Sequence, residues 1–281
     1  MTDSSFSDDS RTFQGSDNRL LKVAVGQLQS GPSEEQNRES IATISRLGAE
    51  SGAELIVFPE FSAFFSPTIE LMTKHAEQRE GGFVQFLQET SNSLQGIAIV
   101  AGFVERKGEE LFSTVAIVRG NEVDYQQKLH LYNAFGAGER GWLSPGFGGA
   151  HTPLTLLGLS VGVAVCYDLR FAEVALEHRS AGAEVLIVPA AWYPGEHKRT
   201  QWEALLRARA IEHQMWVVGV GQAAPQGIGR STIFDPLGRK LIEMGRGPEW
   251  AEATLDLDLT HVTRQHNDME SARRERAATS G

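Results

Sequence analysis

The sequence GAELIVFPE at residues 52–60 returns as a close variant, GAEVLIVPA, at residues 182–190. This repeat is the strongest indication of how the chain folds. In both stretches a glycine ends a predicted helix, an apolar strand follows, and a proline stops that strand. Two matching junctions of this kind predict that the chain contains two related halves.

Strand and helix patterns alternate on both sides of these stretches. Apolar runs predict strands, among them 20–28, 97–103, 161–165 and 216–220. Helical spacing of apolar residues covers 33–49, 83–94, 171–180 and 197–213. This alternation predicts an α/β fold. A predicted hairpin that joins 111–118 to 123–127 indicates that the sheets are mixed.

The alternating pattern occupies residues 20–263 without a linker rich in Ser, Gly or Pro, so we expect one domain there. Residues 1–19 contain five Ser and four Asp and predict a disordered leader. Residues 264–281 contain four Arg and three acidic residues among small ones. We expect a tail there, either a frayed helix or a segment packed on a partner subunit.

The composition excludes several classes of protein. Lys and Arg number 26 and Asp and Glu number 36, and this net charge of −10 argues against nucleic-acid binding, which needs a basic patch. No secretory signal opens the chain, and the longest uncharged stretch, 141–167, holds too many polar and turn residues for a membrane helix. We expect a cytoplasmic protein. A single Cys excludes an internal disulfide and a multi-thiolate metal site.

Three polar residues follow predicted strands, at the position where open α/β sheets carry their reactive groups. They are Glu60, Lys128 and Cys166. The Cys166 thiol is a candidate nucleophile, and Glu60 is a candidate base for its proton. Lys128 could favour the thiolate and stabilise the oxyanion that forms on attack at a carbonyl carbon.

Each of these residues also has a structural interpretation. A cysteine after an apolar strand is often a core residue, and a glutamate after proline often begins a helix. Lys128 could be a solvated strand end. The residues alone leave both interpretations open.

Six blocks of sequence, in order, resemble the nitrilase superfamily of carbon–nitrogen hydrolases over residues 20–257. The first three are FPE (58–60), KLHLYNAFGAGE (128–139) and CYDLRFAE (166–173). The others are PAAW (189–192), QWEALLRARAIEHQMWVVGVGQ (201–222) and GRSTIFDPLGRKL (229–241).

The resemblance implies a four-layer αββα sandwich with two mixed β-sheets and a catalytic triad of Glu60, Lys128 and Cys166. It also implies a second glutamate, for which Glu139 is the matching position. Glu139 would orient Lys128 or the substrate and tune Glu60. The implied reaction passes through a thioester and requires neither a metal ion nor an organic cofactor. A homodimer or a higher homo-oligomer is implied as well.

The CYDLRFAE block resembles the omega-amidase and deaminated glutathione amidase branch more than true nitrilases, which usually carry Trp after the Cys. The expected substrate is a small aliphatic amide, with an omega-carboxylated amide as one candidate. A nitrilase, an N-carbamoyl hydrolase, and a catalytically silent interaction protein on the same fold remain as alternatives.

Several residues near predicted strand ends are candidates for substrate binding. The backbone N–H of Tyr167 is a candidate second oxyanion donor. Trp192 and Tyr193 are expected to wall the pocket. The cations that could pair with a substrate carboxylate are Arg140, Arg170, His197 and Arg199.

Overall fold

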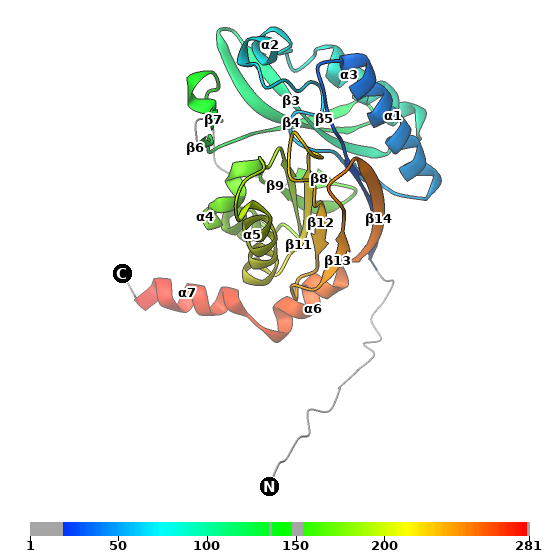
Figure 1. Ribbon diagram of the computed structural model, residues 1–281. Coiled ribbons are helices and arrows are strands. Elements are labelled where there is room, and N and C mark those ends of the chain that lie inside the picture. The colour runs from blue at the N-terminus through cyan, green and yellow to red at the C-terminus, as the bar shows by residue number, and fades with distance from the viewer. Residues whose placement is uncertain (1–18, 135–136, 148–153, 280–281) are drawn as a thin grey trace.

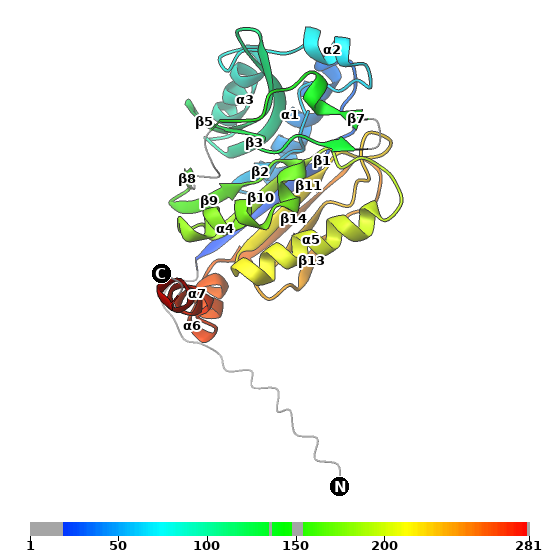
Figure 2. The ribbon, with the colours of Figure 1, turned by 90° about the vertical axis from the view of Figure 1, so that its left-hand side faces the viewer.

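The computed structural model describes residues 19–134, 137–147 and 154–279. Residues 1–18 of the expected leader lie outside this range. Two six-stranded sheets lie face to face in the centre of the molecule, and helices cover their outer faces (Figures 1 and 2).

The first sheet has the strand order β14-β1-β2-β3-β4-β5. Its strands are β1 (Leu20–Gln27), β2 (Leu55–Val57), β3 (Ala98–Lys107), β4 (Glu110–Arg119), β5 (Glu122–Gln127) and β14 (Glu249–Asp256). Strands β1, β2 and β3 are parallel to one another, and the flanking strands pair antiparallel. The sheet is therefore mixed, as the predicted hairpin indicated.

The second sheet has the order β13-β12-β11-β10-β9-β8. Its strands are β8 (Leu154–Leu156), β9 (Leu159–Val163), β10 (Val185–Ala190), β11 (Trp216–Gly221), β12 (Thr232–Phe234) and β13 (Lys240–Glu243). Here β9, β10 and β11 are parallel and the flanking strands antiparallel. The same succession of pairings in both sheets agrees with the two halves inferred from the repeated sequence.

Two helices cover each sheet. Helices α1 (Glu34–Glu50) and α3 (Gly82–Ser93) pack on the first sheet, and α4 (Ala172–Ser180) and α5 (Lys198–His213) pack on the second (Figure 1). The predicted four-layer αββα sandwich is confirmed. Smaller elements are α2 (Ile69–Lys74), the strand pair β6 (Asn133–Ala134) and β7 (Ala137–Gly138), and the 3-10 helices η1 (Glu139–Gly141) and η2 (Cys166–Arg170).

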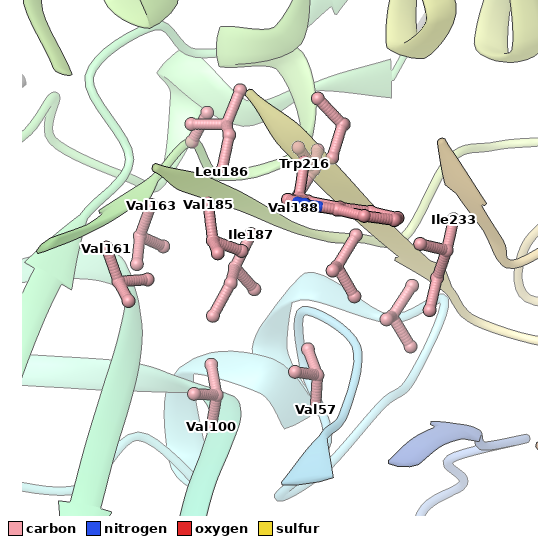
Figure 3. Packing of buried hydrophobic residues seen from close by; sticks show 14 of the residues in the cluster. Val57, Val100, Val161, Val163, Val185, Leu186, Ile187, Val188, Trp216 and Ile233 are labelled. Carbon is pink, nitrogen blue, oxygen red and sulfur yellow. The ribbon is translucent and has the colours of Figure 1, made fainter. Parts of the chain in front are cut away.

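Successive side chains along a strand point to opposite faces, so the first sheet contributes apolar residues to the core on both of its sides. Val57 on β2 belongs to the cluster between the sheets, whereas its neighbour Ile56 packs in the cluster with α1 and α3. In Figure 3, Val57 and Val100 face Val163 and Val185 of the opposite sheet. Each such side chain contributes about 1.5–3 kcal/mol when it is removed from water. Because this apolar packing fixes the two sheets, it also fixes the strand ends.

The C-terminal residues form α6 (Asp258–His266) and α7 (Met269–Thr279). Helix α6 crosses the expected boundary between domain and tail, and Arg273 of α7 donates to the Glu212 carbonyl at 3.1 Å. The structure therefore shows helices in the tail, and its packing on a partner subunit stays a prediction. Among the described residues, no helix has both the length and the apolar character to cross a membrane.

Candidate active site

Four side chains that the sequence singled out meet at one edge of the two sheets. Glu60 follows β2, Lys128 follows β5, Glu139 begins η1 and Cys166 begins η2. Lys128 Nζ donates to Glu60 Oε1 at 3.1 Å and to Glu139 Oε1 at 2.8 Å. In addition to burial, the Glu60 carboxylate lies close enough to Cys166 to raise the pKa of its thiol. The structure thus brings the predicted triad and Glu139 into one continuous array.

The Glu60 carboxylate is held on both oxygens. Ser113 Oγ donates to Oε1 at 2.7 Å, and the Ala191 backbone N–H donates to Oε2 at 3.0 Å. Gly102 on β3 makes room for this segment, because a Cβ there would lie 2.6 Å from the Glu60 Cα. A buried carboxylate needs such partners, since leaving it without them costs several kcal/mol.

Glu139 is fixed by the segment that precedes it. The Tyr132 backbone N–H donates to Glu139 Oε2 at 2.7 Å, and the Glu139 N–H donates to the Tyr132 carbonyl at 2.9 Å. The carboxylate is left with Oε1 turned toward Lys128. Two carboxylates therefore flank one ammonium, and the three charges sum to −1.

Burial and these charges control the protonation of the array. Burial by itself would lower the pKa of Lys128, but Glu60 and Glu139 outweigh it and hold that pKa well above its usual value. Burial also raises the pKa of Glu139. Burial, followed by the nearby Glu60 carboxylate, raises the pKa of the Cys166 thiol well above its usual value. At neutral pH the sulfur therefore carries its proton, and a base must remove it before attack.

The turn that presents Cys166 is strained and tightly anchored. Cys166 has a φ of 50°, in the left-handed region that side chains other than glycine rarely adopt. The Asp168 carboxylate accepts from the backbone N–H groups of Val165, Leu129 and His130 at 3.2, 3.1 and 2.8 Å. Asp168 thereby ties the turn with the sulfur to the segment directly after Lys128.

Cys166 lines a small pocket. The other residues around it are Tyr132, Glu139, Tyr167, Arg170, Ala191, Trp192, Tyr193 and Lys198. Four predicted substrate residues, Tyr167, Arg170, Trp192 and Tyr193, are among them. A substrate group that enters this pocket would meet the residue that carries the sulfur.

The structure does not bring the other predicted cations into this pocket. Arg140 lines a separate hollow beside His130. The His197 side chain is 72 % exposed and pairs with Glu196, and Arg199 pairs with Glu243 on the surface. His197 adopts a φ of 60° directly before α5. Its neighbour Lys198 lines the pocket instead.

Sequence reasoning missed three residues of the site. Lys198 lines the pocket, where it donates to the Tyr132 hydroxyl at 3.0 Å. Ser113 supports Glu60 from the middle of β4. Tyr132 lies within the quoted block 128–139, so the resemblance could have drawn attention to it. Nothing in the local pattern distinguishes Ser113 or Lys198 from an ordinary strand or helix residue.

An apolar hollow of about 990 Å³ adjoins the pocket and shares Glu139 and Tyr193 with it. Phe61, Phe65 and Trp142 also line it. As for metal binding, the part of the chain that the structure describes contains no cluster of three or more His, Cys, Asp or Glu side chains suited to an ion.

The sequence is similar to known proteins over most of its length. A family model described as carbon–nitrogen hydrolase matches residues 22–265. The deaminated glutathione amidase of Escherichia coli O157:H7 is 35 % identical over 220 residues, which is 78 % of this chain and 84 % of that protein. A hydrolase of Mycobacterium tuberculosis is 30 % identical over 259 residues, or 85 % of this chain and 90 % of that protein.

Solved structures show the same arrangement of layers. Nit3 of Saccharomyces cerevisiae, described as a member of branch 10 of the nitrilase superfamily, has a TM-score of 0.77 at 27 % identity, covering 88 % of this chain and 94 % of that one. The NitFhit protein of Caenorhabditis elegans has a TM-score of 0.82 at 24 % identity. That match covers 91 % of this chain and 65 % of the longer NitFhit chain.

Proposed function

The protein belongs to the carbon–nitrogen hydrolase family, and on that premise we propose that it is a thiol amidase that converts a small aliphatic amide to an acid and ammonia. The observation that carries the proposal is the buried array of Glu60, Lys128 and Glu139 beside the one Cys of the chain, at the wall of a pocket.

In the first half-reaction the Cys166 sulfur attacks the amide carbon while Glu60 takes the thiol proton. An ammonium has three N–H groups, and the two carboxylates accept two of those of Lys128. The third is directed to the oxyanion, together with the backbone N–H of Tyr167. Glu60 then passes its proton to the departing nitrogen. The C–N bond breaks, ammonia leaves, and an acyl thioester remains on Cys166.

In the second half-reaction water enters and Glu60 accepts one of its protons. The hydroxide attacks the thioester carbon, the C–S bond breaks, and the acid leaves. The Cys166 sulfur recovers a proton from Glu60, which returns the site to its starting state. Amide and water are consumed, and acid and ammonia are formed, so the atoms balance without any other reactant.

The names of the relatives guide the choice of substrate. Proteins named deaminated glutathione amidase in Escherichia coli and Homo sapiens are 35 % and 31 % identical to this chain. We therefore infer that an amide whose acyl chain ends in a carboxylate is the substrate class. On the basis of the family resemblance, we also propose a homodimer or a higher homo-oligomer, which sedimentation of the purified protein would test. From the acidic composition we propose that the protein is cytoplasmic, which cell fractionation would test.

Ammonia release from wild type and from Cys166→Ala tests the proposal. We expect wild type to hydrolyse succinamate or glutaramate, and Cys166→Ala to retain the fold and lose at least about 10⁴-fold in rate. Glu60→Ala serves as a second inactive variant with the sulfur intact.

Other outcomes would identify a different function. Ammonia from the matching nitriles and not from the amides would indicate a nitrilase. Carbon dioxide released with ammonia from N-carbamoyl compounds would indicate a carbamoyl hydrolase. Unchanged turnover in Cys166→Ala would rule out the thiol mechanism, and no turnover of any of these compounds by wild type would favour a silent interaction protein.

A further inference from the structure

We propose that Lys198 is the anion anchor of the pocket: it binds the carboxylate at the far end of the acyl chain and so selects omega-carboxylated amides over neutral amides of the same length. This inference rests on the proposed amidase function and names the residue that determines its specificity. Lys198 was not among the cations that the sequence suggested.

The position of the Lys198 ammonium is the first support. Its residue is only 8 % exposed, yet it lines the same pocket as Cys166. Nζ donates to the Tyr132 hydroxyl at 3.0 Å and lies 4.7 Å from the centre of the Tyr132 ring. It also lies 5.7 Å from the centre of the Trp192 ring. A positive charge thus faces the space that the substrate must enter.

The charges around the pocket favour an anion at this end. Lys128 is already engaged by two carboxylates, and because that array carries a net charge of −1 it does not attract a substrate carboxylate. Arg170 adds a second cation to the pocket wall, with its guanidinium 4.8 Å from the centre of the same Trp192 ring. Opposite charges attract more strongly in such a poorly solvated place than in water. A substrate carboxylate therefore gains most where Lys198 and Arg170 line the wall.

The backbone holds Lys198 in this orientation before any substrate arrives. The Trp192 indole N–H donates to the Lys198 carbonyl at 3.1 Å. His197, with its positive φ, makes the abrupt turn into α5, which leaves its own side chain in solvent and places Lys198 first in the helix. A group that is already in place loses less conformational entropy on binding. The site is therefore built for recognition and not only for structure.

Two matched pairs of amides test this inference. Succinamate and butyramide differ only in a terminal carboxylate in place of a methyl, and glutaramate and pentanamide differ in the same way. The variants are Lys198→Met, Lys198→Arg, and the control Lys107→Met, which removes one exposed positive charge at the end of β3. The readouts are KM and kcat for each amide, with circular dichroism to establish folding.

We expect Lys198→Met to raise KM for the two anionic amides about 10- to 100-fold, the worth of a charge-assisted hydrogen bond. Its kcat and its KM for the neutral amides should stay within about threefold, because the reacting atoms keep their partners. Lys198→Arg should retain the preference for the anionic amides. Lys107→Met should behave as wild type. If Lys198→Met fails to fold, Lys198→Gln takes its place.

Equal losses for anionic and neutral amides would show a structural role for Lys198 and overturn the inference, as would a wild type without preference for the anionic amides. Binding separates this failure from a failure of the proposed function. Calorimetry of glutaramate and pentanamide with Cys166→Ala, with and without Lys198→Met, needs no turnover. Selective loss of glutaramate binding supports the anchor even if hydrolysis is not observed, and unchanged binding refutes it.

Discussion

The two halves of the molecule share a backbone design but differ in chemistry. Gly52 and Gly182, which open the repeated stretches, have φ values of 87° and 101°, where only glycine is unstrained. The backbone N–H groups of Glu54 and Glu184 each donate to the neighbouring strand at 2.9 Å. These bonds place β2 and β10 identically in their sheets.

The ends of the repeated strands are where the halves differ. The first repeat ends in Glu60 and the second in Ala190, and both residues are buried. The two junctions touch, since Ala191 donates its N–H to the Glu60 carboxylate. Likewise, β5 is followed by the buried Lys128 and β13 by the buried Met244.

The second half thus carries no charge at the positions that correspond to Glu60 and Lys128. The second sheet forms with Ala190 and Met244 at these two positions, and buried ion pairs are often no more stabilising than apolar packing. A catalytic role is therefore the best explanation for the charged residues Glu60 and Lys128 at the strand ends of the first half. Removing the charges from one half at a time tests that conclusion.

The largest effect is expected when Glu60 loses its charge. Glu60→Gln keeps the shape of the side chain but removes the base, so kcat/KM should fall about 10²- to 10⁴-fold. Glu54→Gln makes the same change at the exposed opposite end of β2 and should leave kcat/KM unaltered. Steady-state ammonia release measures both variants. Similar kinetics for the two would mean that the end of β2 has no special role.

Replacing Lys128 by the residue type that follows β13 is the next test. Lys128→Met leaves two apposed buried carboxylates without their cation, which should cost about 3–5 kcal/mol of unfolding free energy in urea titrations. Arg46→Met, which removes a cation from an exposed pair with Glu50, should cost less than about 0.5 kcal/mol.

The pH dependence of Lys128→Met sharpens this test. Burial already raises the pKa of Glu139, and loss of the ammonium raises it further. A carboxyl whose pKa is higher in the folded than in the unfolded state weakens the fold as the pH rises through that pKa. The loss of unfolding free energy caused by Lys128→Met should therefore be larger at pH 8 than at pH 5. A deficit that does not change with pH would contradict the assignment of the buried charges.

A smaller effect on stability is expected from a buried histidine in the helical layer of the second half. The two histidines that are buried in the described chain, His178 and His213, lie on α4 and α5. Burial, followed by the positive charges of Arg273 and Arg209, lowers the pKa of His213 to about 4.

Because that pKa lies below the unfolded value of 6.5, the unfolded state binds more protons between these pH values. Stability should fall as the pH drops, by about 2 kcal/mol at pH 5 relative to neutral pH. Urea titrations of wild type and His213→Gln at pH 7 and pH 5 check this. An equal acid loss in both proteins would assign the sensitivity to other groups.

The sequence predicted the layers because the strand and helix patterns of apolar residues, and the two repeated strand ends, are present in the fold. Their positions after predicted strands made Glu60, Lys128 and Cys166 candidates, and the family resemblance predicted that the three form one triad. The strand expected at 161–165 ends instead at Val163, since the Val165 N–H binds the Asp168 carboxylate rather than a neighbouring strand.

The pocket wall was harder to predict because its residues depend on tertiary contacts. Lys198 lines the pocket only because His197 turns the chain with a positive φ and Trp192 holds the next carbonyl. The helical pattern does not distinguish His197, Lys198 and Arg199. In the structure Lys198 is buried, whereas the side chains of His197 and Arg199 are exposed. Such choices are made by the packed structure and not by local propensity.

The acyl-enzyme is the most direct test of the central claim, that the one Cys of this chain is a nucleophile activated by the charged residues of the first half. Wild type is mixed with glutaramate, quenched in acid within the first turnovers, and measured by intact-protein mass spectrometry followed by peptide mapping. The account predicts an added mass equal to the amide less ammonia, located on Cys166. Steady ammonia release with no adduct on Cys166, together with undiminished turnover in Cys166→Ala, would contradict it.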